Sequence, residues 1–137
     1  MAKIQAIKAR EILDSRGTPT IETTIWSDTG QAAVAAIPSG ASTGKFEAVE
    51  LRDGDPSRFK GMGVIKAVDN VNKIIAPKVV GMDPLYQSKV DKVLIDLDGT
   101  DNKSKLGANA ILSVSQAGCE LGALISGRGI FQYLAEK

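Results

Sequence analysis

The sequence contains no histidine among its 137 residues, and it contains a single cysteine, Cys119. One cysteine excludes an internal disulfide and any zinc site built from several cysteines, so a reducing cytoplasm is the expected compartment. The missing histidine removes the commonest general base and every cysteine–histidine pair. Chemistry in this chain therefore has to come from loops, from carboxylates or from other groups.

Aromatic residues, net charge and long hydrophobic runs are also scarce. Aromatics make up 4% of the residues, which argues against surfaces that stack nucleic-acid bases. The formal net charge is +1, too small to attract nucleic acid or an acidic membrane surface. No apolar run approaches the roughly 18 residues of a membrane span, and the start lacks the pattern of a signal peptide. We expect a soluble domain with no nucleic-acid partner and no membrane span.

The first third of the chain predicts three strands, at 5–10, 20–26 and 31–37. β-Branched residues are concentrated in the second of them, where they suit a pleated surface. Two segments rich in turn-forming residues, 14–19 and 27–30, separate the strands. Connections this short join antiparallel neighbours, because parallel strands need long crossovers. The expected sheet is an antiparallel meander.

Helical spacing begins after residue 63. Hydrophobic residues recur at helical intervals over 64–75, and Pro77 is expected to end or kink that helix. Asp83 and Pro84 are typical of a helix start, with aspartate as the N-cap and proline at the first helical position. The hydrophobic stripe that follows them ends at 98–99.

The longest predicted helix spans about 107–126. Gly118 and Gly122 lie on neighbouring turns, where they would let another backbone approach closely, and Cys119 is expected to be a small core residue. A short amphipathic piece follows at 130–136. Strands first and helices afterwards predict an α+β fold: a three-stranded antiparallel β-meander followed by a bundle of about four helices.

The segment Pro38–Asp55 is a loop whose first half is rich in small and hydroxyl residues. Backbone N–H groups and hydroxyl oxygens of this kind suit phosphates, carboxylates and hard cations, although a plain surface turn has the same composition. The loop is not a P-loop. Three residues rather than four separate Gly40 from Gly44, and Phe46 stands where serine or threonine would bind magnesium.

Arg10, Arg16 and Glu22 are charged residues in or near the predicted strands. They are interpreted either as solvent-facing side chains in ordinary ion pairs or as part of a docking surface for another domain or subunit. From the residues alone, the chain is an α+β domain with one unusual loop and no complete catalytic set.

Four stretches of the chain resemble the N-terminal domain of the enolase family, in the family's order and over essentially the whole length. Thr18 and Met62 depart from the usual asparagine and lysine, and neither lies in the first half of the loop. The resemblance identifies residues 1–137 as an enolase N-terminal capping domain, with the C-terminal barrel domain expected to be absent. The four stretches are AREILDSRGTPTIE (9–22), PSGASTGKFEAVELRDGD (38–55), KAVDNVNKIIAP (66–77) and LDGTDNKSKLGANAIL (97–112).

Enolases dehydrate 2-phosphoglycerate to phosphoenolpyruvate in glycolysis with two magnesium ions, and their catalytic residues lie in the barrel. The resemblance therefore implies that this chain holds no catalytic residue and is inactive alone. It implies a mobile lid loop that binds substrate, with Ser42 as a ligand of the second magnesium through its hydroxyl and carbonyl oxygens. The implied lid residues are Ser39, Gly40, Ala41, Ser42 and Thr43.

The same resemblance implies partners. Arg10 and Glu22 match positions that pair with the barrel of a second subunit, and Arg16 is placed with them at the interface of a homo-oligomer. The chain's own barrel is the other expected partner. Two alternatives stay open: an interaction module for surface adhesion or assembly, and one chain of a split enolase. The expected location is cytoplasmic, with cell-surface display suggested by family analogy only.

Overall fold

The computed structural model describes residues 1–39 and 44–137. Its first elements are three strands, β1 (Ile4–Leu13), β2 (Pro19–Ser27) and β3 (Ala32–Ala36), in the spatial order β1-β2-β3. Both strand pairs are antiparallel, with Arg10 opposite Glu22 across the first pair. The predicted meander is confirmed.

Two tight turns hold the meander in register. In the first, Asp14 Oδ1 accepts the backbone N–H of Arg16 at 2.8 Å and of Thr18 at 2.9 Å. In the second, the N–H of Gly30 donates to Ser27 O at 3.2 Å, and Gly30 has a φ of 91°. Glycine adopts this left-handed conformation without a Cβ clash. The turns predicted at 14–19 and 27–30 are therefore correct.

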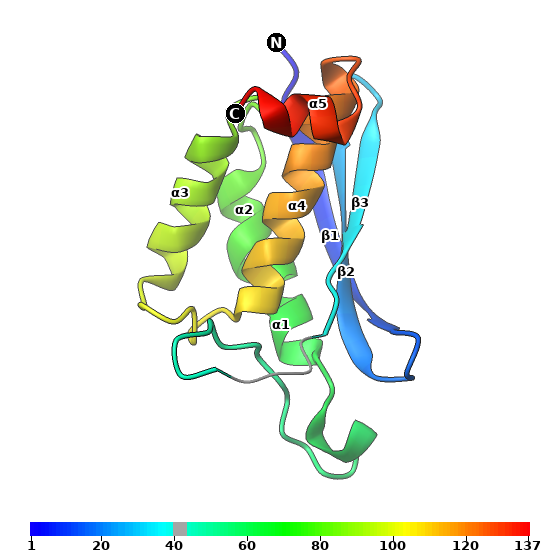
Figure 1. Cartoon of the computed structure of the whole chain (residues 1–137), viewed down its shortest axis with the longest axis vertical. Helices are drawn as coiled ribbons and strands as arrows, with labels where there is room; N and C mark the ends of the chain where they lie inside the picture. The colour runs from blue at the N-terminus through cyan, green and yellow to red at the C-terminus, as the bar shows by residue number, and fades with distance from the viewer. Residues whose placement is uncertain (40–43) are drawn as a thin grey trace.

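The helices follow the strands along the chain. The stretch formed by α1, η2 and α2 is one continuous irregular helix with π-helical geometry in its middle. Together with α3, α4 and α5 it completes the predicted α+β fold of a meander and about four helices (Figure 1). The elements are η1 (Phe59–Gly61), α1 (Ile65–Asp69), η2 (Asn70–Ile75), α2 (Ala76–Val79), α3 (Gln87–Asp98), α4 (Ala108–Ile125) and α5 (Ile130–Ala135).

Of the two expected helix boundaries, only the one at Asp83 is wrong. At Pro77 the expectation was an end or a kink: the helix continues to Val79, and it is irregular just before the proline, in η2. Proline has no N–H to donate and crowds the preceding turn, so the helix widens there instead of stopping. Asp83 does not cap a helix. Its Oδ1 accepts the N–H of Leu85 at 2.9 Å within a turn, and α3 begins only at Gln87.

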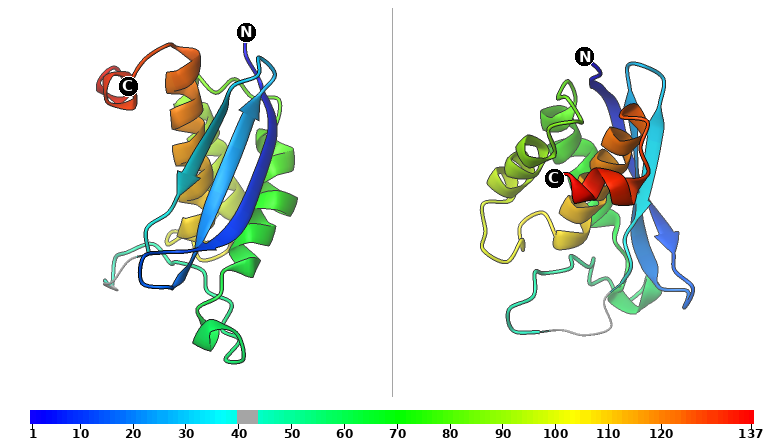
Figure 2. Two further views of the ribbon diagram at one scale, coloured as in Figure 1. Left: turned by 90° about the vertical axis from the view of Figure 1, so that its right-hand side faces the viewer. Right: turned by 45° about the horizontal axis from the view of Figure 1, so that its top comes forward.

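The helices cover one face of the sheet. Helix α4 packs against β2 and β3, while α1 and η2 pack against β1. The core between these layers is built from aliphatic side chains, and one buried polar pair crosses it: Thr23 Oγ1 and Ser113 Oγ lie 2.7 Å apart. In the left view of Figure 2 the other face of the sheet is turned outward, and no described helix covers it. That outer face is available for contacts with another chain or domain.

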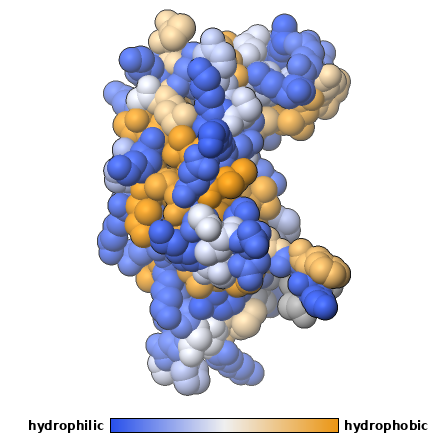
Figure 3. Space-filling view, turned by 90° about the vertical axis from the view of Figure 1, so that its left-hand side faces the viewer, coloured by the Kyte–Doolittle hydropathy of each residue, from blue (hydrophilic) through white to orange (hydrophobic). Residues whose placement is uncertain are grey.

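Helix α3 packs on α4 and forms the outer side of the helical layer. Val90 and Leu94 are buried, whereas Ile95 is half exposed. Figure 3 shows the face that carries α3, where hydrophobic residues gather across the middle with hydrophilic residues above and below them. Among the described residues, no helix combines the length and hydrophobicity needed to cross a membrane.

Candidate functional site

The candidate site is the base of the loop Pro38–Asp55. Of the lid residues proposed from the sequence, Ser39 is described, whereas Gly40, Ala41, Ser42 and Thr43 lie outside the described residues. Ile37, just after β3, is buried and its N–H donates to Ile21 O at 3.0 Å. This bond extends the pairing with β2 and brings Ser39 to the end of the sheet, where the Ser39 carbonyl accepts a long bond from Arg16 Nη2 at 3.4 Å.

The second arm of the loop is fastened to the start of α4. The N–H of Ala108 donates to Val49 O at 2.8 Å. The side chain of Asn109 then binds both backbone groups of Leu51: the Leu51 N–H donates to Oδ1 at 3.1 Å, and Nδ2 donates to the Leu51 carbonyl at 3.0 Å. Asn109 is 3% exposed, so these bonds satisfy polar groups that water does not reach. This arm is consequently fixed.

Helix α4 approaches this arm closely because its N-cap is glycine. Gly107 has a φ of 94°, and a Cβ placed there would lie 2.6 Å from Leu51 Cβ. Any side chain at Gly107 would therefore be strained in its backbone and would clash with the loop. The residue allows α4 to begin directly beside the loop.

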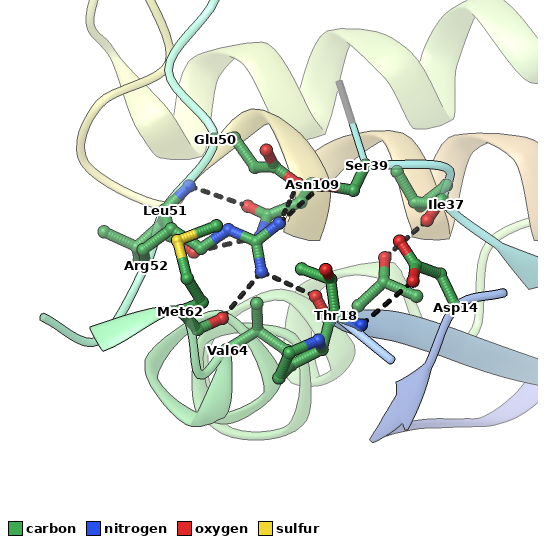
Figure 4. Close-up of polar contacts among 12 residues, drawn as sticks. Asp14, Thr18, Ile37, Ser39, Glu50, Leu51, Arg52, Met62, Val64 and Asn109 are labelled. Carbon is green, nitrogen blue, oxygen red and sulfur yellow. Dashed lines mark hydrogen bonds and ion pairs between the residues drawn. The ribbon is translucent and has the colours of Figure 1, made fainter. Parts of the chain in front are cut away.

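Arg52 joins the two arms. Its Nη2 donates to Ser39 Oγ and to Glu50 Oε1, each at 2.8 Å. Its Nη1 donates to the carbonyls of Pro19 at 2.5 Å and Met62 at 2.7 Å. Figure 4 shows the guanidinium in the centre of these acceptors, which come from four separate stretches of chain. The side chain is 14% exposed, and Nε is buried without a hydrogen-bond partner among the described residues.

Beyond Arg52, the chain is tied to β1 by a second ionic contact. Both terminal nitrogens of Arg58 donate to the carboxylate of Glu11, which also accepts the N–H of Val64 at 2.8 Å. The Arg58 hydrogen bond holds the pKa of Glu11 below its ordinary value of 4.5, although partial burial acts in the opposite direction. The stretch after the loop is thus anchored independently of Arg52.

A hollow of about 550 Å³ lies beside the loop base. Its walls include Pro38 from the first arm, Glu50 and Arg52 from the second, and Asn109 from α4. The hollow places a cation, a carboxylate and backbone groups around one space, as small-molecule sites do.

A larger hollow of about 650 Å³ lies away from the loop, between β3, α4 and α5. Cys119 lines it and is only half-buried, so the expectation of a small core residue is wrong. The cysteine lies on the side of α4 that faces this hollow, whose walls also include residues of β3. Burial of the thiol still raises its pKa.

No metal site is complete within the described ranges. No group of three or more cysteine, aspartate and glutamate side chains there is arranged to hold a metal ion. The hydroxyl of Ser39 already accepts a bond from the Arg52 cation, which disfavours a second cation at that oxygen. A hard cation at this loop would need ligands beyond the described residues, and the hydroxyl and carbonyl oxygens of Ser42 are of the type that magnesium prefers.

The three charged residues assigned to an interface lie in two places. Arg10 Nε contacts Glu22 Oε1 at 2.8 Å across β1 and β2, and the Arg10 side chain is 73% exposed. Arg16 lies instead in the turn between these strands, where it contacts Asp14 and the carbonyl of Ser39. Their role at a subunit interface stays a prediction.

The sequence drew attention to the small residues of the loop and missed Arg52 and Asn109. Their partners are distant in the chain: Arg52 binds Pro19, 33 residues away, and Asn109 binds Leu51, 58 residues away. One signal was available, because an asparagine at the start of an otherwise hydrophobic helix needs partners if it is buried.

Comparison with known proteins identifies a family. The family model described as "Enolase, N-terminal domain" matches residues 4–134. The curated enolase of Malacoplasma penetrans (strain HF-2) is 57% identical over 134 residues. The aligned region covers 98% of this chain and 30% of that relative, so the chain spans under a third of the relative's length.

Proposed function

This chain belongs to the enolase N-terminal domain family, and we propose that it is the capping domain of a magnesium-dependent lyase that dehydrates 2-phosphoglycerate to phosphoenolpyruvate in glycolysis. The observation that carries the proposal is the match over 98% of the chain to a curated enolase, of which it covers the part that the family model describes as N-terminal. The base, the acid and the tighter metal site are assigned to a barrel domain outside residues 1–137. Alone, the chain is therefore catalytically idle.

The proposed contribution of this chain is the loop. Ser42 offers its hydroxyl and carbonyl oxygens to the second magnesium. Gly40 and Ala41 bring the protein backbone close to the substrate without obstruction by a large side chain. When bound, magnesium neutralises the negative charge that develops on the substrate. Ser39 and Thr43 flank these residues and help exclude water. The fixed loop base supports this role, because a lid has to close from a rigid support.

The outer face of the sheet is proposed as the contact with a second subunit. Arg10 is exposed there and pairs with the partly buried Glu22, and this ion pair can be shared with charges on the partner. Arg16, which contacts Ser39, would link that interface to the loop. In this proposal the functional enzyme is a cytoplasmic homo-oligomer. If the chain is instead an interaction module, it should bind a partner without catalysis. If it is one chain of a split enzyme, the barrel should be a separate chain.

The role of Ser42 is tested in a chimeric enzyme. This chain replaces the matched 134 residues of the Malacoplasma penetrans enolase, and dehydration of 2-phosphoglycerate is followed at increasing magnesium. Ser42→Ala should raise the magnesium concentration needed for half-maximal turnover by about tenfold or more, as expected for a lost metal ligand. Ser104→Ala, an exposed serine outside the loop, serves as the matched control. An unchanged magnesium requirement in Ser42→Ala would overturn the assignment.

A further inference from the structure

We propose that Arg52 is a positioning residue for the reaction: its guanidinium sets where Ser39 lies, three residues before the proposed magnesium ligand Ser42. The proposal rests on the function proposed above. Four acceptors converge on one side chain, and they come from the start of β2, from both arms of the loop and from the segment before α1.

The geometry requires arginine. The two terminal nitrogens each donate to two acceptors at 2.5 to 2.8 Å, which uses the planar fork of the guanidinium. A lysine ammonium carries the same charge on a flexible stem and offers three donors from a single point, so it cannot meet the acceptors on both sides. A lysine variant therefore keeps the charge and removes the positioning.

Because Arg52 is mostly buried, Arg52 and Ser39 depend on each other. The Arg52 side chain is mostly buried, and its charge is balanced by the neighbouring Glu50. A buried cation is stable only while its acceptors stay in place, so moving Ser39 leaves a donor of Arg52 without a partner. Ser39 and Arg52 should be energetically coupled for this reason.

The surrounding anchors indicate what Arg52 adds. Leu51 is already held by Asn109, and the next residue but one, Asp53, donates its N–H to Gly63 O at 2.8 Å. Thr20, beside Pro19, is tied to the carbonyl of Ile37. Among the described residues, only Arg52 bonds the hydroxyl of Ser39. Its specific contribution is thus the position of the first loop arm.

The first experiment uses the chain itself. Backbone ¹⁵N relaxation is measured for the amide of Ser39 in the unsubstituted chain, in Arg52→Lys and in Ser39→Ala. Arg58→Lys, which alters a comparable ion pair with Glu11 outside the loop base, is the matched control. Fast motion at position 39 should increase in Arg52→Lys and Ser39→Ala and stay unchanged in Arg58→Lys. Equal relaxation in Arg52→Lys and the unsubstituted chain would overturn the proposal.

The second experiment uses the chimeric enzyme. Arg52→Lys should lower kcat by about tenfold or more at saturating magnesium, because small misplacements of a reacting assembly are costly. Arg58→Lys should retain the parental kcat even if its melting temperature falls. Parental kcat in Arg52→Lys would refute the positioning role. The positioning role would also be refuted if kcat fell in proportion to the melting temperature in both Arg52→Lys and Arg58→Lys. A folded but inactive unsubstituted chimera would instead refute the proposed function, and this inference with it.

Discussion

Asn109 pairs with Leu51 in the way that a neighbouring strand would. The side-chain amide accepts from the Leu51 N–H at 3.1 Å and donates to the Leu51 carbonyl at 3.0 Å. Asn72 repeats the arrangement with Ala9, accepting from its N–H at 2.8 Å and donating to its carbonyl at 3.1 Å. Asn109 thus binds the backbone N–H and carbonyl of a residue in the second arm of the loop, and Asn72 binds those of a residue in the edge strand β1.

Asn109→Asp should destabilise the chain by about 2 kcal/mol, because a carboxylate at this buried position has no N–H to donate and leaves the Leu51 carbonyl without its partner. Urea unfolding measures the change. Asn102→Asp is the matched control, since Asn102 is exposed, and it should stay within about 0.5 kcal/mol of the unsubstituted chain. Equal stability of Asn109→Asp and Asn102→Asp would show that the Leu51 contact contributes nothing.

The two glycines of α4 should respond oppositely to alanine. A Cβ at Gly122 would lie 2.5 Å from Tyr133 Oη and 3.0 Å from the Pro84 carbonyl, so Gly122→Ala should displace α5 and cost roughly 1–3 kcal/mol. At Gly118 the nearest atom is Gln87 Oε1 at 3.9 Å. Gly118→Ala should therefore stabilise the helix by up to about 1 kcal/mol. Thermal unfolding of both variants measures these changes in stability. A stabilised Gly122→Ala would contradict the packing of Tyr133 against α4.

Glu11 should make the chain sensitive to acid. Its pKa in the folded chain lies below the ordinary 4.5, because Arg58 and the Val64 N–H bind the charged form. The stability that it contributes is therefore complete above pH 4.5 and is lost as the pH falls through the folded-state pKa. Glu11→Gln should be less stable at neutral pH and should lose less stability on acidification.

Urea unfolding between about pH 3 and pH 7 measures this dependence. Asp69→Asn is the control, since Asp69 forms an exposed pair with Lys73 at 3.0 Å on the helix surface. Its stability curve should run parallel to that of the unsubstituted chain. Parallel curves for Glu11→Gln would indicate that the Arg58 contact does not favour the charged carboxylate.

Cys119 should be slow to react with thiol reagents at neutral pH. Burial raises its pKa, so the reactive thiolate is scarce in the folded chain. Alkylation by iodoacetamide should be at least about tenfold slower in the folded chain than in urea. An equal rate in both states would show that the hollow between β3, α4 and α5 leaves the thiol open to solvent.

The architecture could be predicted because its signals are local. Turn-forming residues at 14–19 and 27–30 marked the meander, and hydrophobic spacing marked α3 and α4. The loop base could not be predicted in the same way, because Arg52 and Asn109 act through partners far apart in sequence. Pro77 shows a second limit: the sequence indicates a disturbed helix but not whether it ends, and the structure shows that it continues to Val79.

The role of this chain as an enolase cap is tested by comparing turnover of 2-phosphoglycerate by the chimeric enzyme with turnover by this chain alone. We predict no turnover by the 137-residue chain with magnesium present, and turnover by the chimera within about tenfold of the parent enolase. Turnover by the chain alone would show that it contains a catalytic base of its own. A correctly folded chimera without activity would show that this domain does not serve as an enolase cap.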